Sequence, residues 1–381
     1  MADQEADQET ADVVIVGGSL AGLQAALTLG RAVRSVAVID DGHPRNAPAR
    51  RLRNFLAVQD ESPGQFLGRA REGLAQYDVR LIQDRVESAR ARGDGVELTA
   101  ASGRSWRARA LLLATGLREE LPPVPGVAEL WGTDVVACPH CHGWEARGEH
   151  LALIGLPAAP ARTAQRALLV SRWTDRLTLY ANGTELTPQQ RAALAAAGVE
   201  ARDGVVDRLD SEDGRLSAVV LADGTRGEHR TAFVVTRQWQ QTGLARRLGC
   251  EHDEKGGPVD GTVRTDPEGR TSVDRVWAAG STTAPGLLGI GAAGHGSTVA
   301  VAVHNFLTDE ELGLKRLPVA GGPVTGNHRR RCLASGRGHD RVRCPARARR
   351  RTPARGTAPG AGGWPLSRLP RQAHSREPGP R

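Results

Sequence analysis

The chain has 381 residues, enough for two domains of ordinary size, and its 39% hydrophobic and 25% charged residues are typical of a globular protein. No stretch approaches the roughly 18–20 apolar residues of a membrane span, and the acidic N-terminus differs from a secretory signal. We therefore expect a cytoplasmic protein whose residues 1–11 are disordered. Cytoplasmic thiols are kept reduced, so a closely spaced cysteine pair there is more typical of catalysis or metal binding than of a structural disulfide.

The net charge of +8 comes from one end of the chain. Residues 313–381 hold 17 Lys and Arg against two Asp and Glu, whereas the preceding residues hold 34 basic and 41 acidic ones. This Arg-, Pro- and Gly-rich tail lacks apolar periodicity, which predicts disorder. Basic segments attract phosphates, but we favour a solvated extension, with neither nucleic acid nor membrane as a partner.

Residues 12–40 carry the pattern of a β-α-β unit that binds a dinucleotide. An apolar run, a glycine-rich turn, an Ala- and Leu-rich helix and a second apolar run follow in order, and Asp40 ends the unit. Gly17 permits the tight turn, Gly22 lets the helix pack closely on the strands, and the helix N-terminus offers N–H groups to a pyrophosphate. Asp40 has the spacing of a carboxylate that binds a ribose. Ser19 replaces the middle glycine, so the backbone has less freedom to approach the phosphate.

Two later segments add to this pattern. Residues 110–116 read as a buried strand that ends in Ala-Thr-Gly, and residues 271–280 read as another that ends in Ala-Ala-Gly, before a glycine-rich stretch and an Ala/Val helix. Together with residues 12–40, these segments resemble the FAD-binding signatures of flavoproteins with two dinucleotide domains. The resemblance implies an α/β fold with two Rossmann-like domains. Its FAD domain is split into 12–116 and 244–312, and an NAD(P)-type domain is inserted at 117–243.

The inserted segment departs from the family where NADPH would bind. A strand at 151–154 leads into a turn in which Pro157 replaces the glycine that would let the backbone approach a pyrophosphate, and Pro160 removes another N–H donor. After the next strand, residues 181–183 read Ala-Asn-Gly and carry no positive charge for a 2′-phosphate. We expect the fold of this domain to be kept and NADPH binding to be doubtful.

The stretch at 138–145, Cys-Pro-His-Cys-His-Gly-Trp-Glu, carries the chemistry. Its Cys-x-x-Cys-His spacing occurs in redox dithiols, in half of a zinc site and in covalent haem attachment. A zinc site needs further ligands at ordinary spacing, and Cys250 is the remaining cysteine before the tail. Haem attachment normally requires export, for which the N-terminus carries no signal. With three flavin signatures in the same chain, the pattern favours a redox dithiol and no metal.

A Cys-x-x-Cys pair inside the second dinucleotide domain resembles the low-molecular-weight thioredoxin reductases. The full string is more similar to the gliotoxin-type dithiol oxidases and related bacterial flavoproteins, over residues 12 to about 310. The resemblance makes Cys141 the thiol next to the flavin and Cys138 the thiol that exchanges with substrate. It places His142 where thioredoxin reductases have an acid/base aspartate, and imidazole suits that role near neutral pH. For His140, between the cysteines, we favour a steric or solvated role.

Further FAD contacts are implied by position alone. The resemblance assigns them to six residues: Asn54, Thr115, Gly116, Gly280, Ser281 and His295. Ser281 stands where the family has an aspartate, so the hydrogen bond that this aspartate usually makes must be formed differently. His295 has two interpretations, an orienting group for flavin or substrate and a histidine satisfied at a helix start.

Three functions follow as hypotheses. The first is an FAD-dependent oxidase that closes a disulfide in a small-molecule dithiol and returns the electrons to O₂. The second is a reductase of the thioredoxin type that takes electrons from NAD(P)H and has a thioredoxin-like partner. The third is a redox sensor whose basic tail contacts nucleic acid. Related enzymes are commonly homodimers, and some act in the biosynthesis of sulfur-containing natural products, so we expect both here.

Overall fold

The computed structural model describes residues 8–58, 60–253 and 259–314. These residues form one compact unit. The predicted disorder of residues 1–7, and of the tail from residue 315 on, lies outside the described residues.

In the first half of the chain the elements are β1 Glu9–Val16, α1 Leu20–Arg31, β2 Val36–Asp40, α2 Pro63–Glu72, β3 Val79–Gln83, β4 Val86–Arg92, β5 Gly95–Ala100, β6 Ser105–Leu113, β7 Leu117–Glu120, β8 Val135–Val136, α3 Pro139–His142, β9 Leu151–Ile154, α4 Pro160–Val170 and β10 Leu177–Tyr180. The rest are α5 Pro188–Ala196, β11 Val199–Arg202, β12 Val206–Glu212, β13 Arg215–Leu221, β14 Arg226–Glu228, β15 Thr231–Val234, β16 Arg237–Gln240, α6 Leu244–Leu248, β17 His252–Asp253, β18 Val259–Asp260, β19 Thr262–Val263, β20 Val276–Ala278, η1 Gly280–Thr282 and α7 Gly289–Glu311.

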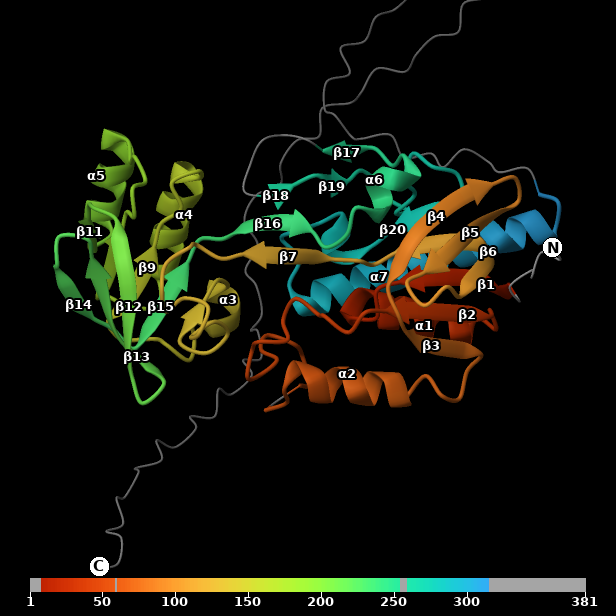
Figure 1. The fold of residues 1–381 in the computed structure, drawn as a ribbon, viewed down its shortest axis with the longest axis horizontal. Coiled ribbons are helices and arrows are strands. Elements are labelled where there is room, and N and C mark those ends of the chain that lie inside the picture. Colours follow the sequence, from red (N-terminus) through yellow and green to blue (C-terminus); the bar gives the residue numbers. More distant parts are fainter. Residues whose placement is uncertain (1–7, 59, 254–258, 315–381) are drawn as a thin grey trace, which may run out of the picture. The chain divides into compact units, whose positions relative to one another are not determined.

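The largest sheet has seven strands in the order β3-β2-β1-β6-β5-β4, with β20 also paired to β6 (Figure 1). Strands β3, β2, β1, β6 and β20 are parallel, and the hairpin β4-β5 adds antiparallel pairing. Strand β6 serves two neighbours in turn, because its first half pairs with β5 and its second half with β20. The carboxyl ends of β1, β2, β6 and β20 therefore lie at one edge of the sheet, and the strand order reverses between β1 and β6.

Both faces of this sheet are covered, as the near-continuous apolar runs of its strands require. Alternate residues such as Val13 and Ile15 pack against helices α1 and α7, with Trp277 and Phe306 in edge-to-face contact. The residues between them, such as Val14 and Val16, pack toward β4, β5 and α6. The sheet is thus packed between two hydrophobic cores, which fix the positions of the loops at its carboxyl edge.

A second α/β unit contains a five-stranded parallel sheet in the order β11-β10-β9-β15-β8. Helices α4 and α5 pack with its apolar residues, and the antiparallel meander β12-β13-β14 contributes to the core with Tyr180 and Val234 (Figure 1). Strands β7 and β16, which pair with each other antiparallel, lie just before and just after this unit in the chain. The two α/β sheets confirm the predicted fold class, and the exact domain boundaries stay a prediction.

Two elements begin earlier than the sequence predicted. Strand β1 begins at Glu9, inside the segment expected to be disordered, because Glu9–Ala11 extend the parallel ladder to β6. Glu9 also forms ion pairs with Arg80 and Arg104. The last helix begins at Gly289, within the glycine-rich stretch that was expected to precede it. Gly296 lies inside that helix, at its contact with α1. A Cβ at this position would come within 2.1 Å of the Ala21 carbonyl oxygen, so the close contact requires glycine.

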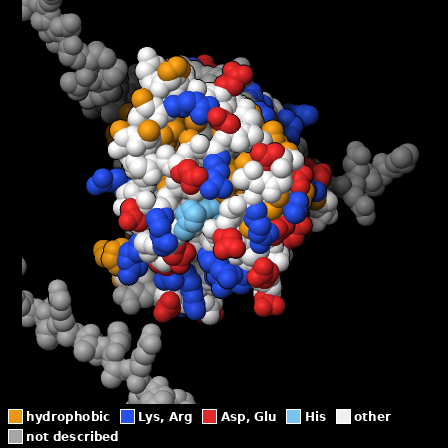
Figure 2. Space-filling view, turned by 90° about the vertical axis from the view of Figure 1, so that its left-hand side faces the viewer, with side chains coloured by type: hydrophobic (Ala, Val, Ile, Leu, Met, Phe, Trp, Pro, Cys, Tyr) orange, Lys and Arg blue, Asp and Glu red, His pale blue; other side chains and the backbone are white. Residues whose placement is uncertain are grey.

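The surface of the described residues mixes both signs of charge on the face shown in Figure 2. Arg side chains alternate there with Asp and Glu, and hydrophobic side chains are scattered. This face therefore offers no single-sign patch for a nucleic acid among the described residues. None of the described helices has the length and apolarity needed to cross a bilayer.

Candidate active site

A cavity opens at the carboxyl edge of the large sheet, lined by the turn after β1. Gly17 has φ +105°, and a Cβ on it would sit 2.3 Å from the Ala114 carbonyl oxygen. Gly18 leaves similar space, since a Cβ there would meet that of Asp40 at 2.9 Å. Only glycine fits the left-handed conformation at the first position without strain. The turn is therefore a backbone cradle, as predicted, and its open side faces the cavity.

Helix α1 starts from this cradle. Ser19 is its N-cap in an extended conformation and makes no side-chain capping bond, so it leaves the N–H groups of the first turn to other acceptors. Ser19 lines the cavity and Gly22 does not. A Cβ on Gly22 would lie 1.8 Å from the Gly17 carbonyl oxygen, which makes Gly22 the contact that brings helix and turn together. The N-terminus of this 12-residue helix suits a pyrophosphate.

The rest of the FAD signature converges on the same cavity. Asp40 lines it at the end of β2, and its carboxylate is 3.4 Å from the Arg71 guanidinium. Thr115, Gly116 and Ser281 also line it. The Gly116 N–H donates to the Thr282 hydroxyl over 2.8 Å, which ties the loop after β6 to the 3-10 turn after β20. Donors, glycines and a carboxylate at this edge fit FAD, whose pyrophosphate residues 17–21 would hold and whose ribose Asp40 would bind.

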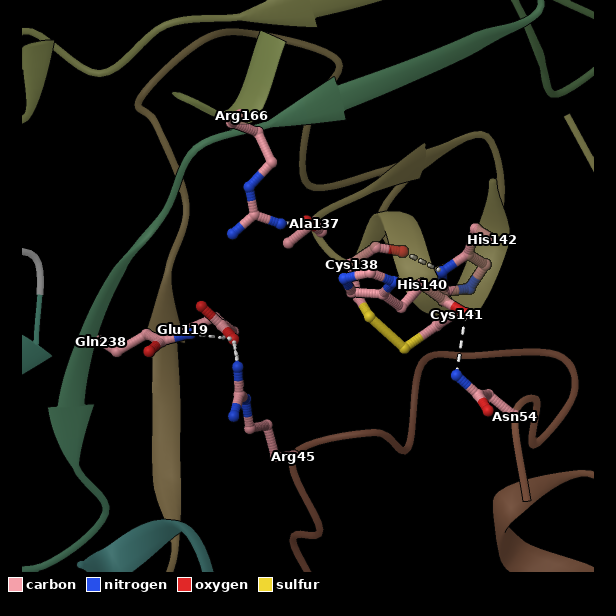
Figure 3. The surroundings of a disulfide bond; sticks show 10 residues. All are labelled: Arg45, Asn54, Glu119, Ala137, Cys138, His140, Cys141, His142, Arg166 and Gln238. Carbon is pink, nitrogen blue, oxygen red and sulfur yellow. Dashed lines mark hydrogen bonds and ion pairs between the residues drawn. A yellow bond between two sulfur atoms is a disulfide. The ribbon is translucent and has the colours of Figure 1, made fainter. Parts of the chain in front are cut away.

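A disulfide between Cys138 and Cys141 lines the same cavity (Figure 3). Cys138 is the N-cap of the short helix α3, and the backbone N–H groups of Cys141 and His142 both donate to its carbonyl oxygen. Proline at position 139 starts the helix with its fixed φ. The two cysteines thus occupy one turn of helix, where their Cα atoms are 5.3 Å apart. Among the described residues, no group of His, Cys, Asp and Glu could hold a metal ion.

His142 lies at the end of α3 and lines the cavity with the disulfide. Its Nδ1 is 3.3 Å from the Cys138 carbonyl oxygen. Burial lowers the pKa of His142 below its ordinary value of 6.5, against the opposing effect of that carbonyl. The imidazole is therefore neutral at pH 7 and can accept a proton there. His140, in contrast, is exposed, with its ring edge-on to Trp173.

Four predicted FAD contacts are not among the residues that line the cavity: Gly22, Asn54, Gly280 and His295. Asn54 has φ +53° and donates from Nδ2 to the His140 carbonyl oxygen over 3.3 Å, so it holds α3 instead. His295 lies in the second turn of α7, because that helix begins earlier than expected. Its Nδ1 accepts from the Gly280 N–H over 3.2 Å. Both side chains therefore fix the backbone around the cavity.

A buried carboxylate near the disulfide escaped the sequence analysis. Glu119, on β7, has a 7% exposed side chain and pairs with Arg45 from the loop after β2. Its carboxylate also accepts from Thr236 and from Gln238 Nε2, the latter over 3.1 Å (Figure 3). Arg45 and Glu119 both line the cavity. No local motif signals this cluster, because the partners of Glu119 lie 74 to 119 positions away from it in the chain.

The turn after β9 has few free donors for a second dinucleotide. The Leu156 N–H donates to the Thr163 hydroxyl over 3.1 Å, and prolines occupy positions 157 and 160. Asn182, buried after β10, donates to the Gly155 carbonyl oxygen over 3.2 Å and accepts from the Val206 N–H. Asn182 therefore fixes the turn. It belongs to the segment 181–183, where the sequence has no basic residue to bind a 2′-phosphate. Weak NADPH binding stays a prediction.

A dinucleotide cradle that shares its cavity with a redox-active Cys-x-x-Cys disulfide defines a class, the flavin-linked disulfide oxidoreductases. Residues 11–305 match the family model described as pyridine nucleotide-disulphide oxidoreductase. The chain belongs to this family and is an FAD-binding oxidoreductase.

Several relatives are named thioredoxin reductases. The chain is 31% identical to thioredoxin reductase tcpT of Claviceps purpurea over 280 residues, which cover 71% of this chain and 85% of that protein. It is 30% identical to thioredoxin reductase sirT of Leptosphaeria maculans, and the match covers 72% of this chain and 87% of that protein. The crystal structure of HlmI is 38% identical with a TM-score of 0.75, and covers 79% of this chain and 94% of its own. The crystal structure of a putative thioredoxin reductase of Bacillus anthracis is 29% identical with a TM-score of 0.74, and the match covers 79% of this chain and 99% of that one. The resemblance to thioredoxin reductase-like flavoproteins is confirmed.

Proposed function

We propose that this protein is an FAD-dependent dithiol oxidase. A small-molecule dithiol loses two electrons and two protons and becomes a disulfide, and O₂ takes up both electrons and both protons as hydrogen peroxide. The single observation that supports this direction is the turn after β9. Its backbone N–H at Leu156 is already bonded to Thr163, and Asn182 fixes it from the other side. Electrons therefore enter more readily through the disulfide than through a nicotinamide.

Two thiol–disulfide exchanges carry the substrate through the site. A substrate thiolate attacks Cys138 Sγ, the bond to Cys141 breaks, and Cys141 leaves as a thiolate. His142 then takes the proton of the second substrate thiol, whose sulfur attacks the first, and Cys138 leaves as a thiolate. The lowered pKa of His142 keeps it neutral and ready for this proton at pH 7. Bound FAD supplies the two-electron acceptor that returns Cys138 and Cys141 to the disulfide.

Anaerobic mixing with dithiothreitol tests this proposal. We expect the dithiol to bleach the flavin absorbance near 450 nm, and admission of air to restore it with formation of one hydrogen peroxide per dithiol. NADPH and NADH, added at the same concentration, should bleach it far more slowly because their site has few free donors. A flavin that dithiothreitol leaves oxidised contradicts the proposal.

A thioredoxin reductase-like activity is the second candidate, and the names of the relatives favour it. In that direction NAD(P)H reduces the flavin, and Cys138 and Cys141 then reduce a thioredoxin-like protein. Rapid bleaching by NADPH or NADH in the same experiment would establish it. A homodimer, a cytoplasmic location and a role in natural-product biosynthesis stay predictions under either direction.

A further inference from the structure

Arg166 reaches from helix α4 to the backbone next to the disulfide. Its Nη1 donates to the Ala137 carbonyl oxygen over 2.6 Å. Ala137 directly precedes Cys138, and both residues line the cavity. Figure 3 shows the Arg166 side chain extended to this carbonyl, with its guanidinium beside Ala137. A fixed cation is thereby held one residue from the cysteine that exchanges with substrate.

This cation has no carboxylate of its own. Glu119 is the acid that acts on both Arg162 and Arg166, but it already pairs with Arg45 and accepts from Thr236 and Gln238. In the part of the chain that the structure describes, neither Arg162 nor Arg166 forms an ion pair. Arg162 lies one turn earlier on the same side of α4, so two positive charges stand together.

The pair stays charged despite its surroundings. Burial, and to a smaller degree Arg162, lower the pKa of Arg166 to about 10, still well above neutral pH. A half-buried cation without a counter-charge costs free energy, and an anion beside it offsets that cost. The group next to Ala137 that becomes an anion during the proposed reaction is Cys138, when its mixed disulfide with the substrate breaks and the product disulfide leaves.

Among the described residues, three other basic groups that line the cavity are neutral or paired with an acid. His142 is neutral at pH 7 because burial lowers its pKa. Arg53, which lines the cavity, forms an ion pair with Glu145 over 3.2 Å. Arg45 is neutralised by Glu119. The charged and titratable groups around the disulfide, from every neighbouring element, are Arg45, Arg53, Glu119, His140, His142, Glu145, Arg162 and Arg166.

We propose that Arg166, supported by Arg162, is a positioning residue that holds the Ala137–Cys138 segment and stabilises the Cys138 thiolate. The inference rests on the proposed exchange role of Cys138. A cation next to a cysteine favours its thiolate, and the thiolate is both the better leaving group and the species that reacts with electrophiles. Arg166 thus makes Cys138 the better leaving group in the exchange that releases the product disulfide.

Two substitutions separate charge from position. Arg166→Gln removes the charge and leaves a shorter side chain with an amide N–H, whereas Arg166→Lys keeps the charge on a different donor. Arg162→Gln removes the neighbouring charge and leaves the bond to Ala137 in place. Flavin absorbance and the thermal midpoint of each holoprotein show whether the variant is folded.

The measurement is the alkylation rate of Cys138 by iodoacetamide in the reduced, anaerobic holoprotein between pH 5 and 10. Mass spectrometry of the Cys138 peptide separates this thiol from the other cysteines. We expect Arg166→Gln to move the midpoint of the rate against pH, which reports ionisation of the Cys138 thiol, to higher pH. Below that midpoint alkylation should be roughly 3- to 10-fold slower, and at pH 10 its rate should match that of the unchanged protein. Arg166→Lys should stay within about twofold, and Arg162→Gln should shift the midpoint less.

Two results would overturn the inference. One is an unchanged midpoint in Arg166→Gln, and the other is an equal loss of rate at every pH in both Arg166 variants, which indicates position without charge. Failure of the oxidase proposal is distinguishable from either result. In that case dithiothreitol does not reduce the flavin, whatever the alkylation profile shows. An alkylation shift without dithiol oxidation would instead assign Arg166 to the reductase direction.

Discussion

Two histidines flank the second cysteine, and only one of them is shielded from water. His142 lines the cavity, and burial lowers its pKa, whereas His140 is exposed against Trp173. A proton acceptor must be neutral at the working pH and close to the reacting sulfur. His142 is neutral at pH 7 and lines the same cavity as the disulfide. The second exchange should therefore depend on His142 and not on His140.

Replacement of His142 by glutamine tests this dependence, with His140→Gln as the matched control. We expect His142→Gln to slow flavin reduction by dithiothreitol by about 100-fold, which is the usual contribution of a general base. The flavin content and spectrum should be unchanged. Stopped-flow absorbance near 450 nm at pH 7 measures the rate, and His140→Gln should stay within about threefold. Equal losses in both variants would remove His142 from the mechanism.

Residues of the site differed in how well the sequence predicted them, and the reason is separation along the chain. Gly17, Asp40 and the cysteine pair belong to patterns of fewer than 30 residues, where local conformation decides the geometry. Glu119 and Arg45 meet only because β7 and the loop after β2 end at the same cavity. Asn54 and His295 were assigned by family position, which does not specify which neighbour a side chain bonds. Their hydrogen bonds to backbone atoms emerged only from the structure.

At the scale of elements, the contact between helix α1 and the turn after β1 shapes the FAD site. Gly22 lies in the first turn of α1, directly against the Gly17 carbonyl oxygen. Helix α7 packs on the other side of α1, where Gly296 lies against the Ala21 backbone. The strand, helix and turn types were predictable because apolar period and glycine spacing are local signals. The early starts of β1 and α7 were not, because pairing with β6 and packing on α1 decide them.

The substitution Gly22→Ala should weaken FAD binding. Its Cβ would lie 1.8 Å from the Gly17 carbonyl oxygen, so the helix or the turn must move and the cradle must widen. We expect at least a tenfold rise in the Kd for FAD and a lower thermal midpoint, measured by flavin titration and thermal unfolding. Gly68→Ala in α2 is the control, because nothing lies within 4 Å of its Cβ and alanine favours a helix by about 0.5–1 kcal/mol. Normal FAD binding in Gly22→Ala would contradict this account.

At the scale of the whole molecule, a buried histidine in the second α/β unit links stability to pH. His229 is 3% exposed, and its Nε2 lies 2.8 Å from the Tyr180 hydroxyl. Its Nδ1 lies 3.1 Å from the His150 carbonyl oxygen, an acceptor, so Nδ1 carries the proton and Nε2 accepts from Tyr180. The His150 ring is 4.4 Å away, between centroids. Burial, above all, lowers the pKa of His229 to about 4.

This pKa predicts that acidification destabilises the fold. The ordinary value of 6.5 applies to the unfolded chain, which then binds more protons than the folded one between pH 6.5 and 4. The contribution of His229 is complete above pH 6.5 and is lost as the pH falls toward 4, by up to about 3 kcal/mol. His142 and His295 act in the same direction, because burial lowers their pKa as well. Their arginine partners lower the pKa of Glu310 and Glu311, that of Glu311 to about 2, so the stability these carboxylates contribute is lost only as the pH falls below their ordinary value of 4.5.

Urea unfolding at pH 7, 6 and 5 with saturating FAD measures the effect. We expect the free energy of unfolding to fall by about 2 kcal/mol between pH 7 and 5 from His229 alone. The substitution His229→Gln keeps a donor for the His150 carbonyl and an acceptor for Tyr180 but cannot be protonated, so its free energy should fall less over the same range. The variant is less stable at pH 7, where its packing is imperfect, and approaches the unchanged protein at pH 5. Parallel curves for the two proteins would show that His229 does not titrate on unfolding.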